Sequence, residues 1–416
     1  MIKRQLYEEL KDHSNKKEIS FIVGPRQAGK TTLILALKKH LEAQGKKTLY
    51  LNLDIESDKQ FFTSQDKLLR KIALEIGKGE GYVFIDEIQR KVDAGLFLKG
   101  LYDMNLPYKL IVTGSGSVEL KEKTHESLIG RKRIFQLPTV SFTEFVNYKT
   151  DYKYETHLAE LFELDPSQTQ RLLEEYLIFG GYPRIILEDS LAEKNRIMAE
   201  LYQSYLERDI GYLLGVLKTE SFSGLVRLMA SQIGKLVNVS ELSNTLGLSI
   251  PTVNHYLWYL QKTFIIGKVT PFFKNIRKEI TKAPVFYFHD LGLRNFALGI
   301  FGTASLESEA GFLFQNFVYH LLKEKTRNTS IQIHYWRTSD KAEVDFVIDI
   351  LPEVIPIEVK YKKLIKPEMT RSFQSFLSKY HPKRGYIIHL GKNNIVKMRG
   401  SVVTSLPYWN IESITF

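Results

Sequence analysis

Apolar runs alternate with amphipathic stretches along the first 137 residues of the chain. The runs EISFIVG at 18–24 and GYVFID at 81–86 are short and continuous, which is typical of strands buried on both faces. The stretches between such runs carry apolar residues at helical spacing. The expected strands are Glu18–Gly24, Thr48–Asp54, Gly81–Asp86, Tyr108–Thr113 and Arg133–Leu137, and the expected helices cover 30–43, 66–75 and 94–102. This alternation predicts an α/β fold in which helices cover both faces of a parallel sheet.

The pattern changes after residue 150. Residues 152–215 are helical and acidic, and Gly180-Gly181-Tyr182-Pro183 interrupts them. Residues 216–300 are again helical and end in short strand-like pieces. The last region is expected to hold helices at 307–325 and 367–380 and strands at 331–337, 343–350, 354–361 and 386–390. We therefore expect four domains: a core at 1–150, a helical lid at 151–215, a third segment at 216–300 and an α/β domain at 301–416.

The composition is that of a globular protein, with 44% apolar and 25% charged residues among 416. This apolar content is sufficient for several cores, which excludes wholesale disorder. The absence of cysteine excludes disulfides, cysteine-ligated zinc, iron–sulfur clusters and thiol catalysis. The N-terminus lacks the apolar core of a signal peptide, and no run approaches the ~20 apolar residues of a membrane-spanning helix. We expect a cytoplasmic protein with no membrane partner.

The net charge is +11, and it is unevenly distributed. Residues 151–215 carry 6 basic and 13 acidic side chains, whereas the regions on either side are basic. A basic region binds nucleic acid in some proteins and is solvated surface in others. Charge alone leaves both interpretations open.

Residues 24–31 match the phosphate-binding pattern G-x-x-x-x-G-K-[ST] and lie between a predicted strand and a predicted helix. Glycines allow backbone N–H groups to surround phosphates, and the helix N-terminus favours negative charge. Lys30 would reach the β- and γ-phosphates, and the Thr31 hydroxyl would bind Mg²⁺. The residues expected to surround the nucleotide are Gly24, Pro25, Arg26, Gln27, Ala28, Gly29, Lys30, Thr31 and Thr32.

The predicted strand at 81–86 ends in two carboxylates, Asp86 and Glu87. Asp86 would hold Mg²⁺ together with Thr31, and Glu87 is placed to polarise the attacking water. An acidic strand end without function is the alternative. The phosphate-binding pattern upstream favours the functional interpretation.

Three further polar residues are candidates for contact with the γ-phosphate. Thr113 ends the next predicted strand and Ser115 follows it. Ligands of parallel sheets bind at the carboxyl ends of strands, and we rank Ser115 ahead of Thr113 as the residue that contacts the γ-phosphate or the attacking water. Arg131 follows Gly130, and an arginine that reaches transition-state charge accelerates phosphoryl transfer strongly. A Gly/Ser turn and a solvated strand start are the respective alternatives.

The sequence resembles a group of bacterial and archaeal P-loop ATPases of the AAA-like superfamily, near the STAND branch, whose C-terminal domain has no known function. The matching motifs span nearly the whole chain. They are GPRQAGKTT (24–32), VFIDEIQ (83–89), TGSGS (113–117), LIGRKRIFQLPTVSFTEF (128–145), GGYP (180–183), LERDI (206–210), GFLFQNFV (311–318) and EVDFVI with PIEVK (343–360).

The resemblance implies a sheet of order 5-1-4-3-2, a helical lid, a winged-helix segment at 216–300 and a restriction-endonuclease-like tail of the PD-(D/E)xK type. It implies ATP and Mg²⁺ as ligands and ATP hydrolysis as the activity. It also places Pro183 near the adenine and assigns Arg131 to sensing phosphate.

Residues 239–260 read as helix–turn–helix, with Ser249 as a cap and Pro251 in the first turn of the second helix. No Lys or Arg lies between Lys235 and Lys262. A helix that reads DNA normally carries phosphate contacts, so packing between domains is favoured over base readout. Residues 274–282, which include four basic side chains, are the better candidates for phosphate contacts.

Asp345, Glu358 and Lys360 fit the D…E-x-K pattern of restriction-endonuclease-like folds. Two carboxylates can hold a divalent metal, and the lysine can assist an attacking water. A solvated strand face is the alternative. Gln315 stands where nuclease relatives usually have a glutamate, so we expect this tail to bind nucleic acid or a partner and to cut slowly or not at all.

The leading hypothesis is an ATP-hydrolysing switch coupled to a basic C-terminal half, with DNA, RNA, a second copy of the chain or another protein as partner. An ATP-regulated nuclease in repair or defence is the second hypothesis. A non-catalytic signalling scaffold that holds nucleotide is the third.

Overall fold

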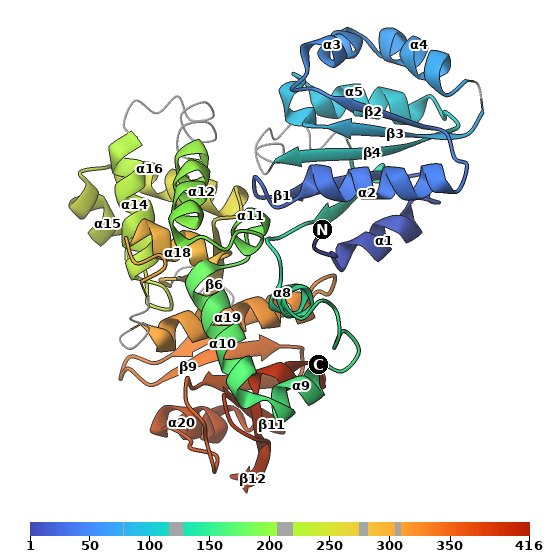
Figure 1. Ribbon diagram of the computed structural model, residues 1–416. Helices are drawn as coiled ribbons and strands as arrows, with labels where there is room; N and C mark the ends of the chain where they lie inside the picture. The colour runs from blue at the N-terminus through green and yellow to red at the C-terminus, as the bar shows by residue number, and fades with distance from the viewer. Residues whose placement is uncertain (78, 116–127, 206–218, 274–281, 304–308) are drawn as a thin grey trace. The chain divides into compact units, whose positions relative to one another are not determined.

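The computed structural model describes residues 1–416 except 78, 116–127, 206–218, 274–281 and 304–308 (Figure 1). Within that part of the chain, no helix is both long and apolar enough to cross a membrane. The chain divides into two compact units. The first unit comprises Met1–Asp151, Gly181–Thr219 and Trp258–Ile265, and the second comprises Tyr152–Gly180, Glu220–Leu257 and Ile266–Phe416.

The first unit is built on a five-stranded sheet in which all the strands are parallel. Its strands are β1 (Ile19–Gly24), β2 (Thr48–Asn52), β3 (Gly81–Asp86), β4 (Tyr108–Ser115) and β5 (Lys132–Gln136). They lie in the order β2-β3-β4-β1-β5, which confirms the expected order. The carboxyl ends of β1, β3 and β4 therefore share one edge of the sheet.

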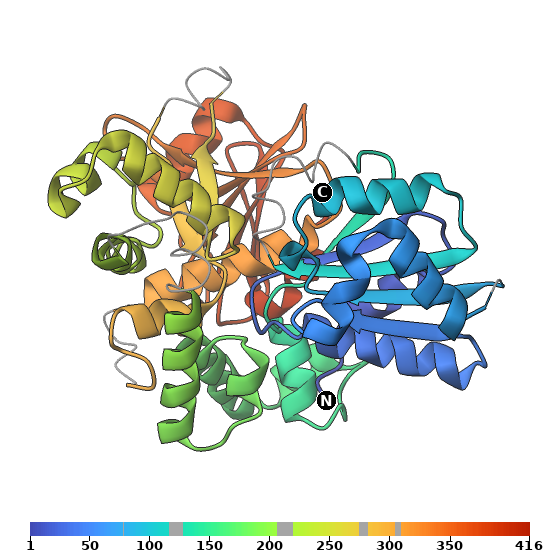
Figure 2. The same cartoon turned by 90° about the horizontal axis from the view of Figure 1, so that it is seen from above.

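Helices cover both faces of this sheet (Figures 1 and 2). On one face, α1 (Leu6–His13) and α2 (Lys30–Ala43) bury their leucines against Ile22, Phe84 and Ile111. On the other, α4 (Gln65–Glu75) and α5 (Ala94–Asp103) pack on the opposite side chains of the same strands. Because both faces of the sheet are buried, side chains on both sides of each central strand are apolar, which explains the continuous apolar runs in the sequence. Among its described residues, this unit also contains the helices α3 (Glu56–Lys59), α8 (Phe142–Lys149), α11 (Pro183–Ile186) and α12 (Leu191–Ser204), with 3₁₀ turns at Gln60–Thr63 and Ile88–Arg90.

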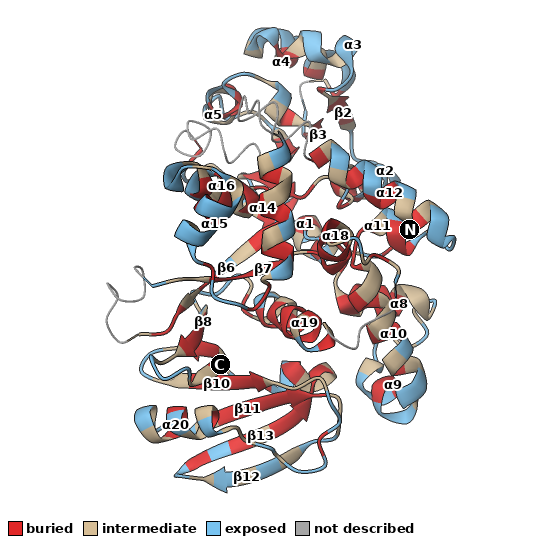
Figure 3. Ribbon diagram, turned by 90° about the vertical axis from the view of Figure 1, so that its left-hand side faces the viewer, coloured by how far each residue is buried: buried red, intermediate tan, exposed pale blue. Residues whose placement is uncertain are grey.

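The second unit contains an eight-stranded mixed sheet of order β12-β13-β11-β10-β9-β8-β6-β7. Its strands are β6 (Ile266–Pro271), β7 (Val285–Phe288), β8 (Gln332–Arg337), β9 (Glu343–Asp349), β10 (Val354–Val359), β11 (Arg384–His389), β12 (Asn394–Met398) and β13 (Ser401–Pro407). Figure 3 shows β11 and β13 mostly buried and β12 at the more exposed edge. The helices in the described part of this unit are α9 (Leu158–Leu164), α10 (Pro166–Phe179), α14 (Thr219–Ser231), α15 (Val239–Leu246), α18 (Leu291–Ala297), α19 (Ala310–Lys325) and α20 (Arg371–Tyr380), with a 3₁₀ turn at Tyr408–Ser413. Helix α16 (Ile250–Lys262) begins in this unit and ends in the first.

The strands predicted at the end of 216–300 belong to the same sheet as the tail. β6 pairs with β8 in parallel, with Thr270 opposite His334. These backbone hydrogen bonds join strands on either side of residue 300, where the sequence pattern placed a domain boundary. A pattern of apolar residues along the chain does not show which strands will pair across such a boundary. Of the expected phosphate-contact loop, residues 274–281 lie outside the described residues, as does the LERDI motif.

Arg294 of α18 is completely buried in the second unit. Its guanidinium donates to the Ala230 carbonyl at 2.9 Å and to Asn295 Oδ1 at 3.2 Å, and it pairs with Glu309 at the start of α19. A buried charge is tolerated only when its hydrogen bonds are satisfied. Arg294 therefore ties α18 to the ends of α14 and α19.

Replacing Arg294 by methionine is expected to lower the free energy of unfolding by about 3 kcal/mol, because a carbonyl, an amide and a carboxylate lose their donor together. Arg131→Met is the control, since Arg131 forms a half-exposed ion pair with Asp103, and the loss of a solvent-screened pair should lower the free energy of unfolding far less. Urea denaturation measures both. Equal losses in the two variants would contradict the role given to Arg294.

Candidate nucleotide site

The predicted phosphate loop joins the end of β1 to the start of α2. Gln27 and Gly29 have positive φ angles of 56° and 96°, which turn successive peptide planes within the loop. Lys30, the first residue of α2, is buried, and its ammonium donates to the carbonyls of Gly24 at 3.0 Å and Pro25 at 2.8 Å. The ammonium thus lies inside the curve of the loop, where the phosphate-binding pattern predicts the β- and γ-phosphates of the nucleotide.

Gly24 has a packing requirement of its own. A Cβ at this position would lie 2.1 Å from the carbonyl oxygen of Leu137, because Leu137, directly after β5, donates its N–H to the carbonyl of Val23, the residue before Gly24 on β1. The first glycine of the motif is therefore needed for the close approach of two backbones.

Gly24→Ala is expected to lower the unfolding midpoint and to displace the phosphate loop, because backbone atoms cannot move away as a flexible side chain can. Gly79→Ala is the control, since nothing lies within 4 Å of its added Cβ. Thermal unfolding of the two variants, followed side by side, measures the difference. An unchanged midpoint in Gly24→Ala would contradict the packing argument.

The carboxylate of Asp86 is completely buried at the end of β3 and is surrounded by hydroxyl groups. Its Oδ2 accepts from Thr31 Oγ1 at 2.7 Å and from the Tyr50 phenol at 2.9 Å. Its Oδ1 accepts from Thr113 Oγ1 and from the Glu87 N–H at 3.1 Å. The two residues predicted to hold Mg²⁺, Thr31 and Asp86, are thus in direct contact.

Of the residues that donate to Asp86, sequence reasoning missed Tyr50 and ranked Thr113 behind Ser115. Tyr50 lies on β2, beside β3, and burial together with the Asp86 charge raises the pKa of its phenol, so the phenol stays protonated and donates. Thr113 is fully buried on β4. Ser115, ranked first, ends β4, and its side chain lies outside the described residues.

Glu87 follows Asp86 with φ of 57° and is the N-cap of a 3₁₀ turn. Burial raises the pKa of its carboxyl, while the charge of Lys30 lowers it. The Gln89 side chain donates to one of its oxygens. Glu87 is therefore near Lys30 and Asp86 and has the raised pKa typical of a proton acceptor at an active site.

Pro183 and Arg131 occupy different places relative to the loop. Pro183 begins α11, and its Cγ lies 3.9 Å from the position of a Cβ on Gly29, so it adjoins the loop. Arg131 precedes β5 at the amino edge of the sheet, where its carbonyl accepts from Ile19 N–H and its guanidinium binds Asp103. β1 separates this position from the loop, so the structure does not bring Arg131 to the phosphate site of its own chain.

The residues predicted in the tail do come together. Asp345 Oδ1 accepts from Gln315 Nε2 at 2.9 Å, and its Oδ2 accepts from Val359 N–H at 2.7 Å. Glu358 pairs with Lys360 at 2.7 Å. Burial, with a contribution from the Glu358 charge, raises the pKa of Asp345 to about 7. Both Asp345 oxygens are engaged, and in the described ranges no group of three His, Asp or Glu side chains is arranged to hold a metal ion.

Three family models match consecutive parts of the chain. Residues 16–146 match an AAA domain, and residues 170–304 and 310–409 match two domains of unknown function, DUF8612 and DUF4143. An uncharacterized Mycobacterium tuberculosis protein, Rv2008c, is 27% identical over 90% of this chain and 77% of its own length. An uncharacterized Haemophilus influenzae protein is 26% identical over 93% of this chain and 92% of its own.

Solved structures resemble the chain only distantly. The Aeropyrum pernix Orc1 protein in complex with DNA has a TM-score of 0.29 and 13% identity over 70% of this chain and 91% of its own. DnaA from Aquifex aeolicus bound to AMPPCP has a TM-score of 0.28 and 14% identity over 63% of this chain and 88% of its own. At TM-scores this low, the solved structures support neither a fold nor a function for this chain. The AAA match and the contact between Thr31 and Asp86 support a P-loop ATPase domain at residues 16–146.

Proposed function

We propose that this chain binds ATP with Mg²⁺ at residues 24–32 and hydrolyses it. The observation that carries the proposal is the 2.7 Å hydrogen bond from Thr31 Oγ1 to Asp86 Oδ2. These two side chains come from motifs more than fifty residues apart, and their contact creates a pair of oxygen ligands beside a buried lysine.

The donor set fits the ion. Mg²⁺ prefers oxygen ligands and is commonly held by one or two protein groups together with phosphates. Thr31 and Asp86 would hold it, and it would neutralise charge on the β- and γ-phosphates. Tyr50 and Thr113 fix the orientation of the Asp86 carboxylate through their hydroxyls.

The chain's own groups divide the remaining work. The Lys30 ammonium exchanges the carbonyls of Gly24 and Pro25 for phosphate oxygens. The Glu87 carboxylate accepts a proton from the attacking water as the water oxygen bonds to the γ-phosphorus, the bond from that phosphorus to the β–γ bridging oxygen breaks, and ADP leaves with phosphate as the other product. Pro183 adjoins the phosphate loop at Gly29, and the family resemblance assigns it to the adenine.

We further propose that ATP binding and hydrolysis switch the state of the second unit, which contacts nucleic acid or another protein. The helices α14, α15 and α16 followed by the antiparallel pair β6–β7 are consistent with a winged helix. In the tail, the side chain that donates to Asp345 is the neutral amide of Gln315, at the position where nuclease relatives usually have a glutamate, and the loss of that carboxylate favours binding over cleavage.

Calorimetry with ATP and ADP, followed by phosphate release with Mg²⁺ in the presence and absence of DNA, tests the proposal. We expect binding of both nucleotides, turnover with Mg²⁺ and a change of turnover with the correct partner. The absence of heat with any nucleoside triphosphate would refute the nucleotide site. Bound ADP without turnover under every condition would favour the scaffold hypothesis.

A further inference from the structure

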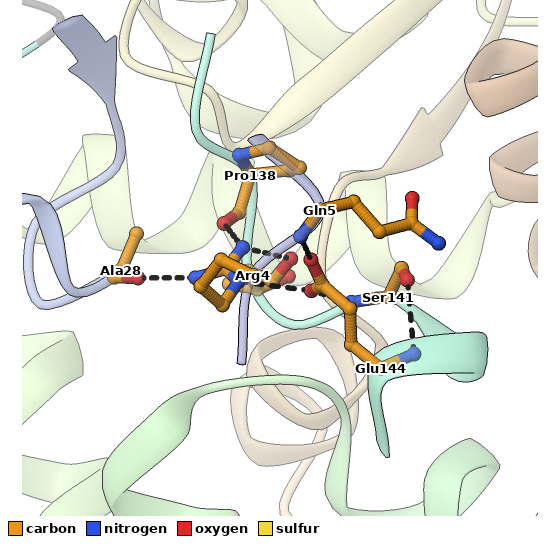
Figure 4. A network of polar contacts seen from close by, with 7 residues as sticks. Arg4, Gln5, Ala28, Pro138, Ser141 and Glu144 are labelled. Carbon is orange, nitrogen blue, oxygen red and sulfur yellow. Dashed lines mark hydrogen bonds and ion pairs between the residues drawn. The ribbon is translucent and has the colours of Figure 1, made fainter. Parts of the chain in front are cut away.

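Arg4 lies ahead of α1, outside every motif named above, yet its side chain is only 7% exposed (Figure 4). Its Nη1 donates to the carbonyl of Ala28 in the phosphate loop at 2.8 Å. Its Nη2 donates to the carbonyls of Pro138 at 2.7 Å and Thr139 at 3.2 Å, beyond β5. One guanidinium thus connects the phosphate loop to the segment after the edge strand of the sheet.

Glu144 holds this guanidinium in place. Its Oε2 accepts from Arg4 Nε at 2.9 Å, and its Oε1 accepts from Gln5 N–H at 2.7 Å. The same carboxylate also accepts from Ser141 N–H in the capping box that begins α8. Arg4 is therefore a buried cation with a buried partner, and its orientation is determined on every side.

The bond to Ala28 determines the direction of a neighbouring amide. The Ala28 carbonyl and the Gly29 N–H belong to one planar trans peptide, so they point in opposite directions. When Arg4 holds the carbonyl, the Gly29 N–H is held pointing away from Arg4. In a loop that binds phosphate through backbone N–H groups, this amide is one of the donors.

The loop needs such support. Gln27 has a positive φ of 56°, an uncommon conformation for a residue with a side chain, and it directly precedes Ala28. Backbone strain of this kind persists only where surrounding contacts impose it. Arg4 supplies a charged contact at this point of the loop.

We propose that Arg4 is a positioning residue of the nucleotide site. It holds the Ala28–Gly29 peptide in the orientation that receives phosphate before nucleotide arrives. The inference rests on the proposed function, because it concerns the same loop, and it adds the N-terminal segment to the parts of the chain that determine nucleotide affinity.

Arg4→Met is expected to weaken binding of both ATP and ADP by roughly 10- to 100-fold, because the peptide is no longer oriented in advance. KM for ATP should rise by a similar factor, and kcat should change much less. Arg4→Lys keeps the charge for Glu144 but cannot reach three carbonyls, so its affinity should be intermediate. Without nucleotide, amide exchange over residues 25–29 should be faster in Arg4→Met.

Lys109→Met is the matched control for a loss of stability. Lys109 is also a buried basic side chain that donates to two carbonyls, those of Lys16 at 2.8 Å and Glu18, but at the amino edge of the same sheet. We expect this variant to lose stability and to keep its nucleotide affinity. If it weakens nucleotide binding as much as Arg4→Met does, the effect is general destabilisation and the inference is wrong.

The remaining outcomes separate the inference from the proposed function. If the wild-type chain binds ATP and folded Arg4→Met binds it equally well, the inference fails and the function stands. If the wild-type chain binds neither ATP nor ADP, both fail. If Arg4→Met does not fold, Arg4→Lys and Glu144→Gln replace it, and unchanged affinity in both folded variants overturns the inference.

Discussion

Lys30→Ala is expected to lower the affinity for ATP by roughly 100-fold or more. The ammonium is buried inside the loop and donates to the carbonyl oxygens of Gly24 and Pro25. Phosphate oxygens carry negative charge and are far stronger acceptors than these carbonyls, so the lysine gains most when nucleotide arrives. ADP should lose affinity as well, because its β-phosphate lies within reach of the same group.

The fold should survive this substitution. Lys30 loses two hydrogen bonds, but the folded state no longer buries a cation among backbone groups. Lys38→Ala is the control on the same helix, since Lys38 pairs with Glu42 at the surface. Titration of both variants with ATP, together with their thermal unfolding, measures the effect. Wild-type affinity in folded Lys30→Ala would remove residues 24–31 from the nucleotide site.

The parts of this site that the sequence predicted have local signatures. The phosphate loop and the acidic end of β3 are short patterns in a strand–turn setting, and buried strands read as continuous apolar runs. The helix at Lys30–Ala43 and the strand at Gly81–Asp86 have the bounds expected from the sequence. Both follow from periodicity and from the residues that begin or end an element.

The parts that the sequence did not predict depend on contacts between distant segments. Tyr50 reaches Asp86 only because β2 lies next to β3, and no local pattern marks which strand will be its neighbour. Glu144 is part of the readable capping box Ser-x-x-Glu, but nothing in that pattern indicates that its carboxylate also binds Arg4. β12 was missed because its exposed, alternating residues pair only with β13.

Glu87→Gln is expected to leave ATP binding within a few-fold of wild type and to slow hydrolysis by roughly 100- to 10,000-fold, the usual contribution of a general base. The amide has nearly the size of the carboxylate but cannot accept the proton of the attacking water. Because burial raises the pKa of the Glu87 carboxyl, the uncharged amide should leave the fold as stable as before, or more stable. Glu42→Gln, at the exposed surface of α2, is the control and should change neither ATP binding nor the rate of hydrolysis.

The pH dependence of turnover gives an independent test of the same residue. A carboxyl with a raised pKa stays protonated to a higher pH than an ordinary glutamate, so the base form of Glu87 is lost earlier as the pH falls. Wild-type turnover at saturating ATP should therefore rise with pH through this raised pKa and then level off. The residual turnover of Glu87→Gln should lack that rise, because no carboxyl remains to titrate. Unchanged turnover in Glu87→Gln, or the same pH profile in both proteins, would show that another group accepts the proton; the buried Asp86, already bonded to Thr31 and Tyr50, would be the next to test.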